Sequence, residues 1–205
     1  MAFDELVVSF FVDEVVGGFF ISVPPGHVAC IFDRGRGVLP RVWGPGLHIK
    51  IPFWQIAKLF NAQILEYTIT EGFDLSRKET LGDKAINATL KDSELIQVEG
   101  SVLFKINKTK APDLWENVGE NFVSKVVRPV ARSRIRSVLS EVNTEQLTAY
   151  RTQVEKKVKE ELNDIFNDKG LACEGFLLSE VKLLGDPTTP KDDKVLLAHK
   201  PEDKK

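Results

Sequence analysis

The chain of 205 residues contains little cysteine, histidine or methionine: two Cys, three His and one Met. Cys30 and Cys173 lie far apart and lack the spacing of a disulfide framework or a zinc site, so we expect two buried free thiols in a reducing compartment. His27 and His48 fall on separate expected strands, which favours hydrogen-bonded structural roles. The sequence therefore predicts neither a disulfide nor a metal site.

Catalytic motifs are missing as well. The sequence has no Gly-x-Ser-x-Gly, no His-Glu-x-x-His, no Cys-x-x-Cys and no Gly-Lys-Ser/Thr phosphate loop. The run Asp33-Arg34-Gly35-Arg36-Gly37 is too short for a dinucleotide fingerprint and indicates a turn. We expect no enzyme, and we assign no catalytic, cofactor-binding or metal-binding residue.

The chain also lacks an excess of one charge. Its 28 Lys and Arg against 30 Asp and Glu give a net charge of −2, which disfavours a nucleic-acid partner. Its 42% hydrophobic and 28% charged residues are ordinary for a soluble globular protein. A chain of this length buries roughly 70% of its unfolded surface and has room for one or two domains.

The longest hydrophobic run stops short of a membrane span. Residues 6–23 hold twelve apolar side chains, but Asp13 lies near their middle, and an Asp at the centre of a spanning helix costs about 2.5–3.5 kcal/mol. We therefore expect no transmembrane helix. Two interpretations stay open: a helix lying in the membrane surface with Phe10 and Phe11 on its apolar face, or a short helix in the protein core followed by a strand at 19–23.

The next part of the chain predicts short strands with Pro/Gly corners. Residues 19–32 indicate a hairpin that turns at Pro24-Pro25-Gly26. Leu47–Ile51 alternates as a strand, and we expect Leu47, Ile49 and Ile51 to face inward. Phe53 and Trp54 then pack beneath a loop or form an interfacial patch, since Trp favours the headgroup layer. The membrane-contact candidates are Phe10, Phe11, Phe19, Phe20, Phe53 and Trp54.

The remaining elements change from strand to helix and back. The strong period-2 pattern from Ile96 to Ile106 predicts a strand with one buried face, and Pro129 predicts a helix start near Arg128 or a kink there. Strands come first, helices follow and a strand closes the domain, so the class is α+β with a mostly antiparallel sheet. The expected elements are strands 64–70, 85–90, 95–106 and 171–184, the last buried at Phe176-Leu177-Leu178, and helices 110–119, 121–140 and 144–168, the last capped by Asn143 and Gln146 and divided near Thr152.

One basic stripe is visible on the expected helix 121–140. Arg128, Arg132 and Arg136 are spaced i, i+4 and i+8, which places them on one slowly drifting line. They form either a solvated face with salt bridges or a contact with another protomer or a lipid phosphate. They are the oligomer-contact candidates.

The order of these fragments resembles the stomatin/prohibitin/flotillin (SPFH, band 7) domain, closest to stomatin- and prohibitin-like members. The likeness covers roughly residues 19–184. It is carried by the runs Val23–Phe32, Trp43–Phe53, Gln97–Ile106, Ala111-Pro112-Asp113-Leu114, Val126–Ser133, Asn143–Leu147 and Lys169-Gly170-Leu171.

The resemblance implies a non-enzymatic membrane-associated scaffold that oligomerises and organises or regulates membrane proteins, such as an ATP-dependent protease or a channel. The extent of the likeness and the composition of the two ends predict the division of the chain. An apolar segment, 1–18, precedes a domain at 19–185 with subdomains at roughly 19–90 and 91–185. A disordered tail, 186–205, follows, in which Val195-Leu196-Leu197 could dock.

Two departures from the family pattern shape the expected partners. Asp13 and Glu14 lie where the family has a membrane anchor, and a proline-containing tail replaces its coiled coil. We therefore expect a peripheral protein on the cytoplasmic side of a membrane, bound to the lipid surface. It would form a homo-oligomer or co-assemble with a longer family member. The alternative is a soluble protein-binding adaptor of the same fold without membrane contact.

Overall fold

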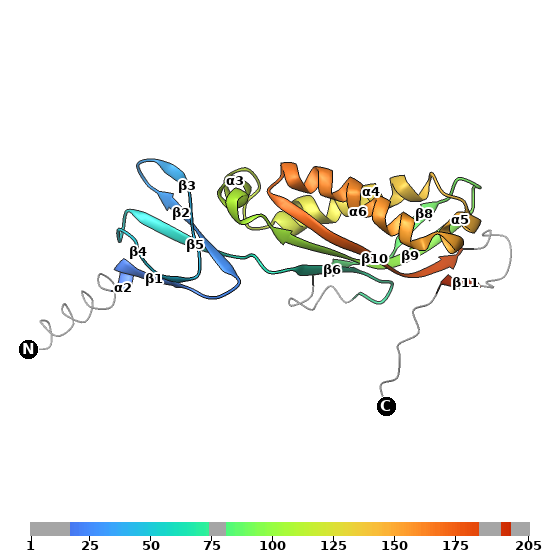
Figure 1. The fold of residues 1–205 in the computed structure, drawn as a ribbon, viewed down its shortest axis with the longest axis horizontal. Coiled ribbons are helices and arrows are strands. Elements are labelled where there is room, and N and C mark those ends of the chain that lie inside the picture. Colours follow the sequence, from blue (N-terminus) through green and yellow to red (C-terminus); the bar gives the residue numbers. More distant parts are fainter. Residues whose placement is uncertain (1–16, 74–80, 185–193, 198–205) are drawn as a thin grey trace, which may run out of the picture. The chain divides into compact units, whose positions relative to one another are not determined.

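The computed structural model describes residues 17–73, 81–184 and 194–197 (Figure 1). The chain forms two compact units: unit 1 comprises Met1–Gln63 and Ile106–Glu120, and unit 2 comprises Ile64–Lys105 and Asn121–Lys205. The α+β class with mostly antiparallel sheets is confirmed. The division after Gln63 differs from the expected boundary near residue 90, because a hairpin across residue 90 holds both sides in unit 2.

Unit 1 is built from short strands and one short helix. Strand β2 is the centre of a three-stranded sheet and pairs antiparallel with β3 and β5, whereas β1 and β4 form a separate antiparallel two-stranded ribbon. The elements are α2 (Gly17–Phe19), β1 (Phe20–Val23), β2 (His27–Asp33), β3 (Gly37–Trp43), β4 (Gly46–Ile49), β5 (Gln55–Asn61), η2 (Lys108–Lys110) and α3 (Ala111–Asn117).

The corner after β1 forms as expected, but the predicted hairpin 19–32 is wrong. The backbone N–H of His27 donates to the Pro24 carbonyl at 3.2 Å, and Gly26 has φ = 79°. The strands on either side of this corner nevertheless pair with other strands, β1 with β4 and β2 with β3 and β5. The physical reason is burial: residues 28–31 are all buried, so β2 needs a neighbour along both edges.

The core of unit 1 lies between this sheet and α3. Val28, Cys30 and Leu114 are among its buried side chains. The Phe60 and Trp115 rings meet edge to face at 6.2 Å. This small core uses the inward side of the strands and leaves apolar residues on other surfaces of the unit.

Unit 2 is a sheet with helices over one face (Figure 1). The strand order is β11-β10-β9-β6-β7, with β8 also paired to β9; β6 and β8 run antiparallel to β9, and β7 runs parallel to β6. The elements are β6 (Leu65–Ile69), β7 (Gly82–Asp83), β8 (Ile86–Thr89), β9 (Leu95–Ile106), the π-helix η3 (Val123–Val127), α4 (Arg128–Leu139), α5 (Thr144–Ala149), α6 (Arg151–Asp168), β10 (Leu171–Leu183) and β11 (Lys194–Leu197).

The buried face of β9 confirms the period-2 prediction. Ile96, Val98, Val102, Phe104 and Ile106 are all buried. The Phe104 ring meets Phe122 and Phe166 edge to face, each at 6.4 Å. The strand face and the apolar stripe of α6 thus form one core.

Local sequence determines the helix ends. Pro129 lies in the first turn of α4, which starts at Arg128 as expected. The capping box of Asn143 and Gln146 starts α5. The helix is interrupted at Tyr150, and α6 begins at the next residue. Gly170, with φ = 78°, ends that helix region.

Strands β10 and β11 form the closing part of unit 2. Leu177 was expected to be buried but is exposed, because the alternation of β10 directs Phe176 and Leu178 inward and Leu177 outward. Within the expected tail 186–205, the hydrophobic run at 195–197 lies in β11, which pairs antiparallel with β10. The rest of that tail lies outside the described residues.

Candidate functional site

Exposed apolar side chains of unit 1 lie on α2, on β1, on β4, on the turn that follows β4 and on both faces of β5. They are called here the apolar surface of unit 1. Each is at least 39% exposed, and several exceed 60%. Its members are Phe19, Phe20, Leu47, Ile49, Ile51, Phe53, Trp54, Ile56 and Leu59.

The β1–β4 ribbon separates this surface from the core. Phe20 is opposite Ile49 in the register, and Ser22 is opposite Leu47, so these four side chains share one face because paired residues point the same way. The other face carries Val23, which is 2% exposed.

The prediction that Leu47, Ile49 and Ile51 face inward is therefore wrong: they are 69%, 67% and 55% exposed. The opposite face is anchored instead by His48, which lies between Leu47 and Ile49. Its ring stacks on Trp43 at a centroid distance of 5.1 Å, and its Nε2 lies 2.7 Å from the Gly44 carbonyl oxygen. The alternation is confirmed, but its apolar side faces solvent rather than the core.

A strained turn exposes the two aromatic residues after β4. Phe53 is 65% exposed and has φ = 60°. A positive φ of this kind costs a non-glycine residue roughly 1–2 kcal/mol. The Trp54 N–H donates to the Pro52 carbonyl at 2.7 Å, and the Gln55 N–H donates to the Ile51 carbonyl at 2.9 Å. The strain is accepted in a turn that directs a large apolar ring toward solvent.

The buried carboxylate of Asp33 fixes this turn from inside the unit. It accepts hydrogen bonds of 3.0 Å each from the Gly35 N–H, the Arg36 guanidinium and the Gln55 amide. Gln55 in turn accepts from the Ile51 N–H at 3.1 Å. The hydrogen bonds from Arg36 and Gln55 hold the pKa of Asp33 well below its usual range, so Asp33 is an anion at neutral pH.

Trp54 is held against the turn that joins β2 and β3. Its carbonyl accepts from the Arg34 N–H at 3.1 Å. A Cβ at Gly35 would lie 3.4 Å from Cζ2 of the indole, so the glycine gives the ring room to lie there. The half-exposed indole is therefore positioned by the fold of unit 1.

The sequence located part of this surface. Phe19, Phe20, Phe53 and Trp54 are exposed in unit 1, whereas Phe10 and Phe11 lie outside the described residues. The five aliphatic members were missed. Period-2 alternation could have revealed three of them, but alternation says which residues share a face and not whether that face is covered. The missed residues are Leu47, Ile49, Ile51, Ile56 and Leu59.

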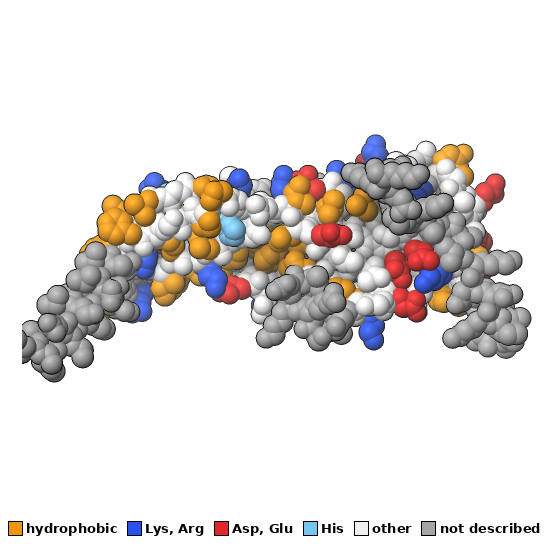
Figure 2. All heavy atoms as spheres, turned by 90° about the horizontal axis from the view of Figure 1, so that it is seen from below, with side chains coloured by type: hydrophobic (Ala, Val, Ile, Leu, Met, Phe, Trp, Pro, Cys, Tyr) orange, Lys and Arg blue, Asp and Glu red, His pale blue; other side chains and the backbone are white. Residues whose placement is uncertain are grey.

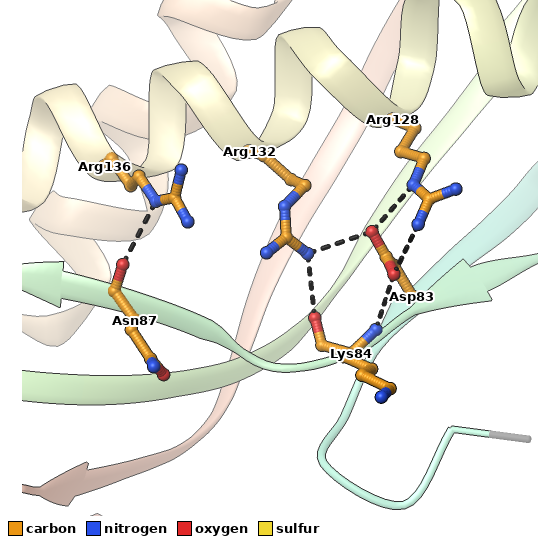
Figure 3. Close-up of polar contacts among 6 residues, drawn as sticks. All are labelled: Asp83, Lys84, Asn87, Arg128, Arg132 and Arg136. Carbon is orange, nitrogen blue, oxygen red and sulfur yellow. Dashed lines mark hydrogen bonds and ion pairs between the residues drawn. The ribbon is translucent and has the colours of Figure 1, made fainter.

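The basic stripe lies in unit 2, and two of its three arginines bind a buried carboxylate (Figure 3). Nε and Nη2 of Arg128 donate to the two oxygens of Asp83 at 2.8 Å each. Arg132 Nη1 donates to Asp83 at 2.9 Å and to the Lys84 carbonyl at 3.0 Å, and Arg136 Nε donates to the Asn87 carbonyl at 3.0 Å. Each arginine of the stripe thus ties α4 to β7 or to the start of β8.

Asp83 is 4% exposed. Burial alone would raise its pKa, but the hydrogen bonds from Arg128 and the Lys84 N–H and the nearby charge of Arg132 outweigh burial and lower it. The carboxylate of Asp83 thus forms ion pairs with both Arg128 and Arg132 inside unit 2. An intermolecular role for the stripe remains a proposal.

Other reactive side chains are dispersed. Both cysteines are free and buried, as expected, and burial raises the pKa of each thiol to about 11. A hollow of about 300 Å³ beside α4 and α6 contains Glu141 and Lys157, which pair with each other. Within residues 17–73, 81–184 and 194–197, no group of three or more His, Cys, Asp or Glu could hold a metal ion.

The described residues include no helix that is both long and apolar enough to cross a bilayer. The model of the SPFH domain / Band 7 family matches residues 21–191 of the chain. Prohibitin-4, mitochondrial, of Arabidopsis thaliana is 27% identical over 106 residues, which are 52% of this chain and 33% of that protein. Prohibitin 1 of Gallus gallus and of Mus musculus are each 27% identical over 113 residues, 55% of this chain and 36% of theirs. The matched stretch spans about a third of these curated relatives.

Proposed function

The chain belongs to the SPFH domain / Band 7 family, and from this premise we propose that it is a non-enzymatic scaffold that docks on a membrane surface. It contacts lipid through the apolar surface of unit 1 and, as an oligomer, organises or regulates membrane proteins. Docking is peripheral and takes place on the side of a reducing compartment, in keeping with two free thiols.

The observation that carries this proposal is the exposed apolar surface itself. Phe20, Leu47 and Ile49 share one exposed face of the β1–β4 ribbon, and clustered exposed apolar side chains mark contact sites more often than scattered ones do. Phe53 and Trp54 stand out because a strained turn, fixed by Asp33 and Gln55, holds them toward solvent. Trp is the residue type that prefers the layer between headgroups and acyl chains.

Vesicle co-sedimentation tests the docking. The variant Phe53→Asp/Trp54→Asp places two charges where we expect apolar rings to enter the interface. Burial of one Phe side chain is worth about 1.5–3 kcal/mol, so we expect binding to weaken by at least about a hundredfold for the pair. Far-UV circular dichroism and the unfolding midpoint verify that the variant is folded.

The matched control is Leu177→Asp, which adds a charge at an equally exposed apolar position on β10 in unit 2. Leu177 and Trp54 are both 51% exposed. The control should bind vesicles like the wild type. An equal loss of vesicle binding in Phe53→Asp/Trp54→Asp and in Leu177→Asp would contradict docking through the apolar surface. Absence of vesicle binding by the wild type would contradict membrane docking and would favour the soluble adaptor.

For assembly, we propose that the chain forms a homo-oligomer or co-assembles with a longer relative, with Arg128, Arg132 and Arg136 near the contact. Arg128 and Arg132 hold Asp83, so their reversal would disturb the fold. Arg136 bonds a backbone carbonyl and is the better probe. Arg136→Glu should lower the mass measured by light scattering while the circular dichroism spectrum stays native; an unchanged oligomer mass would remove this residue from the contact.

The proposal also includes a class of partner protein. A membrane-embedded protease that uses ATP, or a channel, suits a scaffold that lies on the same lipid surface. Co-purification from detergent-solubilised membranes, with wild type against the Phe53→Asp/Trp54→Asp variant, tests whether recruitment depends on docking. A partner captured equally by both would indicate binding without lipid contact.

A further inference from the structure

We propose that the free edge of β5 in unit 1 pairs antiparallel with the same edge of a second copy of this chain. The inference rests on the homo-oligomer proposed above and adds a place where two copies meet and the chemistry of the contact. Three observations carry it: unpaired backbone groups along β5, exposed apolar side chains on both of its faces, and protection of other sheet edges in the chain.

Strand β5 has one paired edge. It is the last strand in the order β3-β2-β5, and all seven of its residues pair with β2 in an unbroken register. The ladder continues just beyond both ends of the strand, where the Ala62 N–H donates to the Gly26 carbonyl at 2.8 Å and the Arg34 N–H donates to the Trp54 carbonyl at 3.1 Å. These two contacts show which residues form the hydrogen-bonded pairs of the ladder.

The other edge of β5 presents unpaired backbone groups. Hydrogen-bonded pairs alternate along an antiparallel ladder, so the even-numbered residues bond to β2. The N–H and C=O groups of Ala57, Leu59 and Asn61 then point away from β2. Among the residues that the structure describes, no strand pairs with this edge. A row of unpaired backbone groups is a template for another strand.

Hydrophobic side chains lie at the surface of unit 1 (Figure 2), and two of them flank this edge. Ile56 and Leu59 are 49% and 40% exposed, and alternation places them on opposite faces of β5. A flat contact covers one face of a strand. A strand added along the edge sets its side chains beside both residues, so Ile56 and Leu59 fit a protein strand better than a lipid surface.

Other sheet edges carry features that block such an addition. At the opposite edge of the same sheet, β3 contains Pro40 and has an irregular register with β2, and both features disfavour strand pairing. In unit 2, the Arg136 guanidinium donates to the Asn87 carbonyl of β8, and β11 pairs with the end of β10. By contrast, β5 is regular and contains no proline.

A second copy matches this edge in charge and in register. The one charged side chain of β5, Lys58, pairs with Glu120 at 2.8 Å, so the edge carries no uncompensated charge that would repel its copy. A two-fold axis at Leu59 sets this residue opposite Leu59 of the second copy and sets Ala57 opposite Asn61, which brings the free backbone groups together. An axis at Lys58 would set two lysines opposite each other, which is destabilising.

Self-association of the full chain, measured by light scattering over a range of protein concentration, tests this contact. Leu59→Lys places two like charges at the axis and removes the apolar pair, so we expect self-association to weaken by at least about tenfold. Leu59→Pro removes an N–H of the free edge without removing a bond to β2, and we expect the same effect. The control Leu95→Lys, at a 43% exposed position of β9 in unit 2, should associate like the wild type.

Cysteine crosslinking tests the register. The Cα atoms of a hydrogen-bonded antiparallel pair lie about 5.5 Å apart, which is within reach of a disulfide. Leu59→Cys should therefore give a covalent dimer when oxidised with copper phenanthroline, whereas Leu95→Cys should not. The two native thiols are buried. Far-UV circular dichroism verifies that each variant is folded, and if Leu59→Lys and Leu59→Pro fail to fold, the crosslink decides.

The outcomes separate this inference from the proposed assembly. An oligomer that keeps its mass in Leu59→Lys and Leu59→Pro, and that gives no crosslink through Leu59→Cys, overturns pairing along β5 and leaves assembly through Arg136 intact. Weakened association without the crosslink overturns the axis at Leu59. A wild type that is monomeric at every concentration removes the homo-oligomer, and the second copy as occupant of this edge falls with it.

Discussion

The carboxylate of Asp33, at the end of β2, accepts a hydrogen bond of 3.0 Å from the amide of Gln55, at the start of β5. Gln55 also accepts a bond of 3.1 Å from the Ile51 N–H. The two contacts close the turn that exposes Phe53 and Trp54. A polar pair inside unit 1 thus controls the shape of the apolar surface on its outside.

Replacement of Gln55 tests this control. Gln55→Ala removes both hydrogen bonds, and each is worth about 1 kcal/mol, so we expect the free energy of unfolding of unit 1 to fall by roughly 2 kcal/mol. Vesicle binding should weaken as well, because the strained turn at Phe53 loses its anchor. Urea unfolding and co-sedimentation measure the two effects. Gln63→Ala, an exposed glutamine of the same unit, should change neither.

Acid should destabilise the chain through Asp33 and Asp83. The pKa of each is lowered in the folded state, and an unfolded Asp titrates near about 3.9. A lowered pKa means that the stabilisation is fully present above the unfolded value and is lost as the pH falls through the folded one. We expect the free energy of unfolding to decline below about pH 4.

Urea unfolding at a series of pH values measures this decline. Asp33→Asn should be less stable than the wild type at neutral pH and should show a shallower loss in acid. Asp164→Asn, at an exposed position of α6, should reproduce the wild-type profile. A wild-type stability that is flat down to pH 3, or an Asp33→Asn profile as steep as the wild type's, would contradict the assignment.

Elements whose cause is local could be predicted from the sequence. Pro129 determines where α4 begins, Asn143 and Gln146 form the expected capping box, and the alternation from Ile96 to Ile106 gives the buried face of β9. Each rests on a steric or hydrogen-bonding rule that involves neighbours within a few residues. The membership of the family followed from the order of such fragments.

Features that depend on distant partners could not be predicted. The pairing of β1 with β4 rather than β2 joins residues more than twenty positions apart, and it leaves Leu47 and Ile49 outside. The salt bridge of Asp83 with Arg128 links residues 45 apart. The sequence therefore predicted the arginine stripe but not that Asp83 is its partner. For the candidate site, residue type indicated Phe53 and Trp54, but only the register identified the aliphatic members.

A double-mutant cycle should show strong coupling between Asp83 and Arg128. Their two hydrogen bonds of 2.8 Å form a bidentate pair at a nearly buried carboxylate. Asp83→Ala should lower the free energy of unfolding by about 2 kcal/mol or more, because Arg128 and Arg132 lose their common partner. Arg128→Ala should cost less, since Arg132 still pairs with Asp83. A coupling energy below about 0.5 kcal/mol would mean that the pair does not stabilise the folded chain.

The two thiols should resist modification in the folded chain. Burial raises the pKa of Cys30 and Cys173 to about 11, so the reactive thiolate is a small fraction at neutral pH, and both groups are shielded from solvent. We expect Ellman's reagent to react slowly with native protein and rapidly in denaturant. Cys30 lies in unit 1 and Cys173 in unit 2. In the Cys173→Ala variant the remaining Cys30 thiol reports the opening of unit 1, and in the Cys30→Ala variant the Cys173 thiol reports the opening of unit 2. Fast reaction of either thiol under native conditions would contradict its burial.

Gly100 should tolerate no side chain, for a reason that composition alone does not reveal. A Cβ at this position of β9 would lie 2.5 Å from the Leu177 carbonyl oxygen of β10, and a backbone carbonyl cannot turn aside as a flexible side chain can. Gly100→Ala should therefore push β9 and β10 apart and lower the free energy of unfolding by about 1–3 kcal/mol. Gly72→Ala, where a Cβ meets no atom within 4 Å, is the matched control in unit 2. Equal stability of the two variants in urea would show that the strands can separate locally without cost, and close packing of the sheet at Gly100 would have to be abandoned.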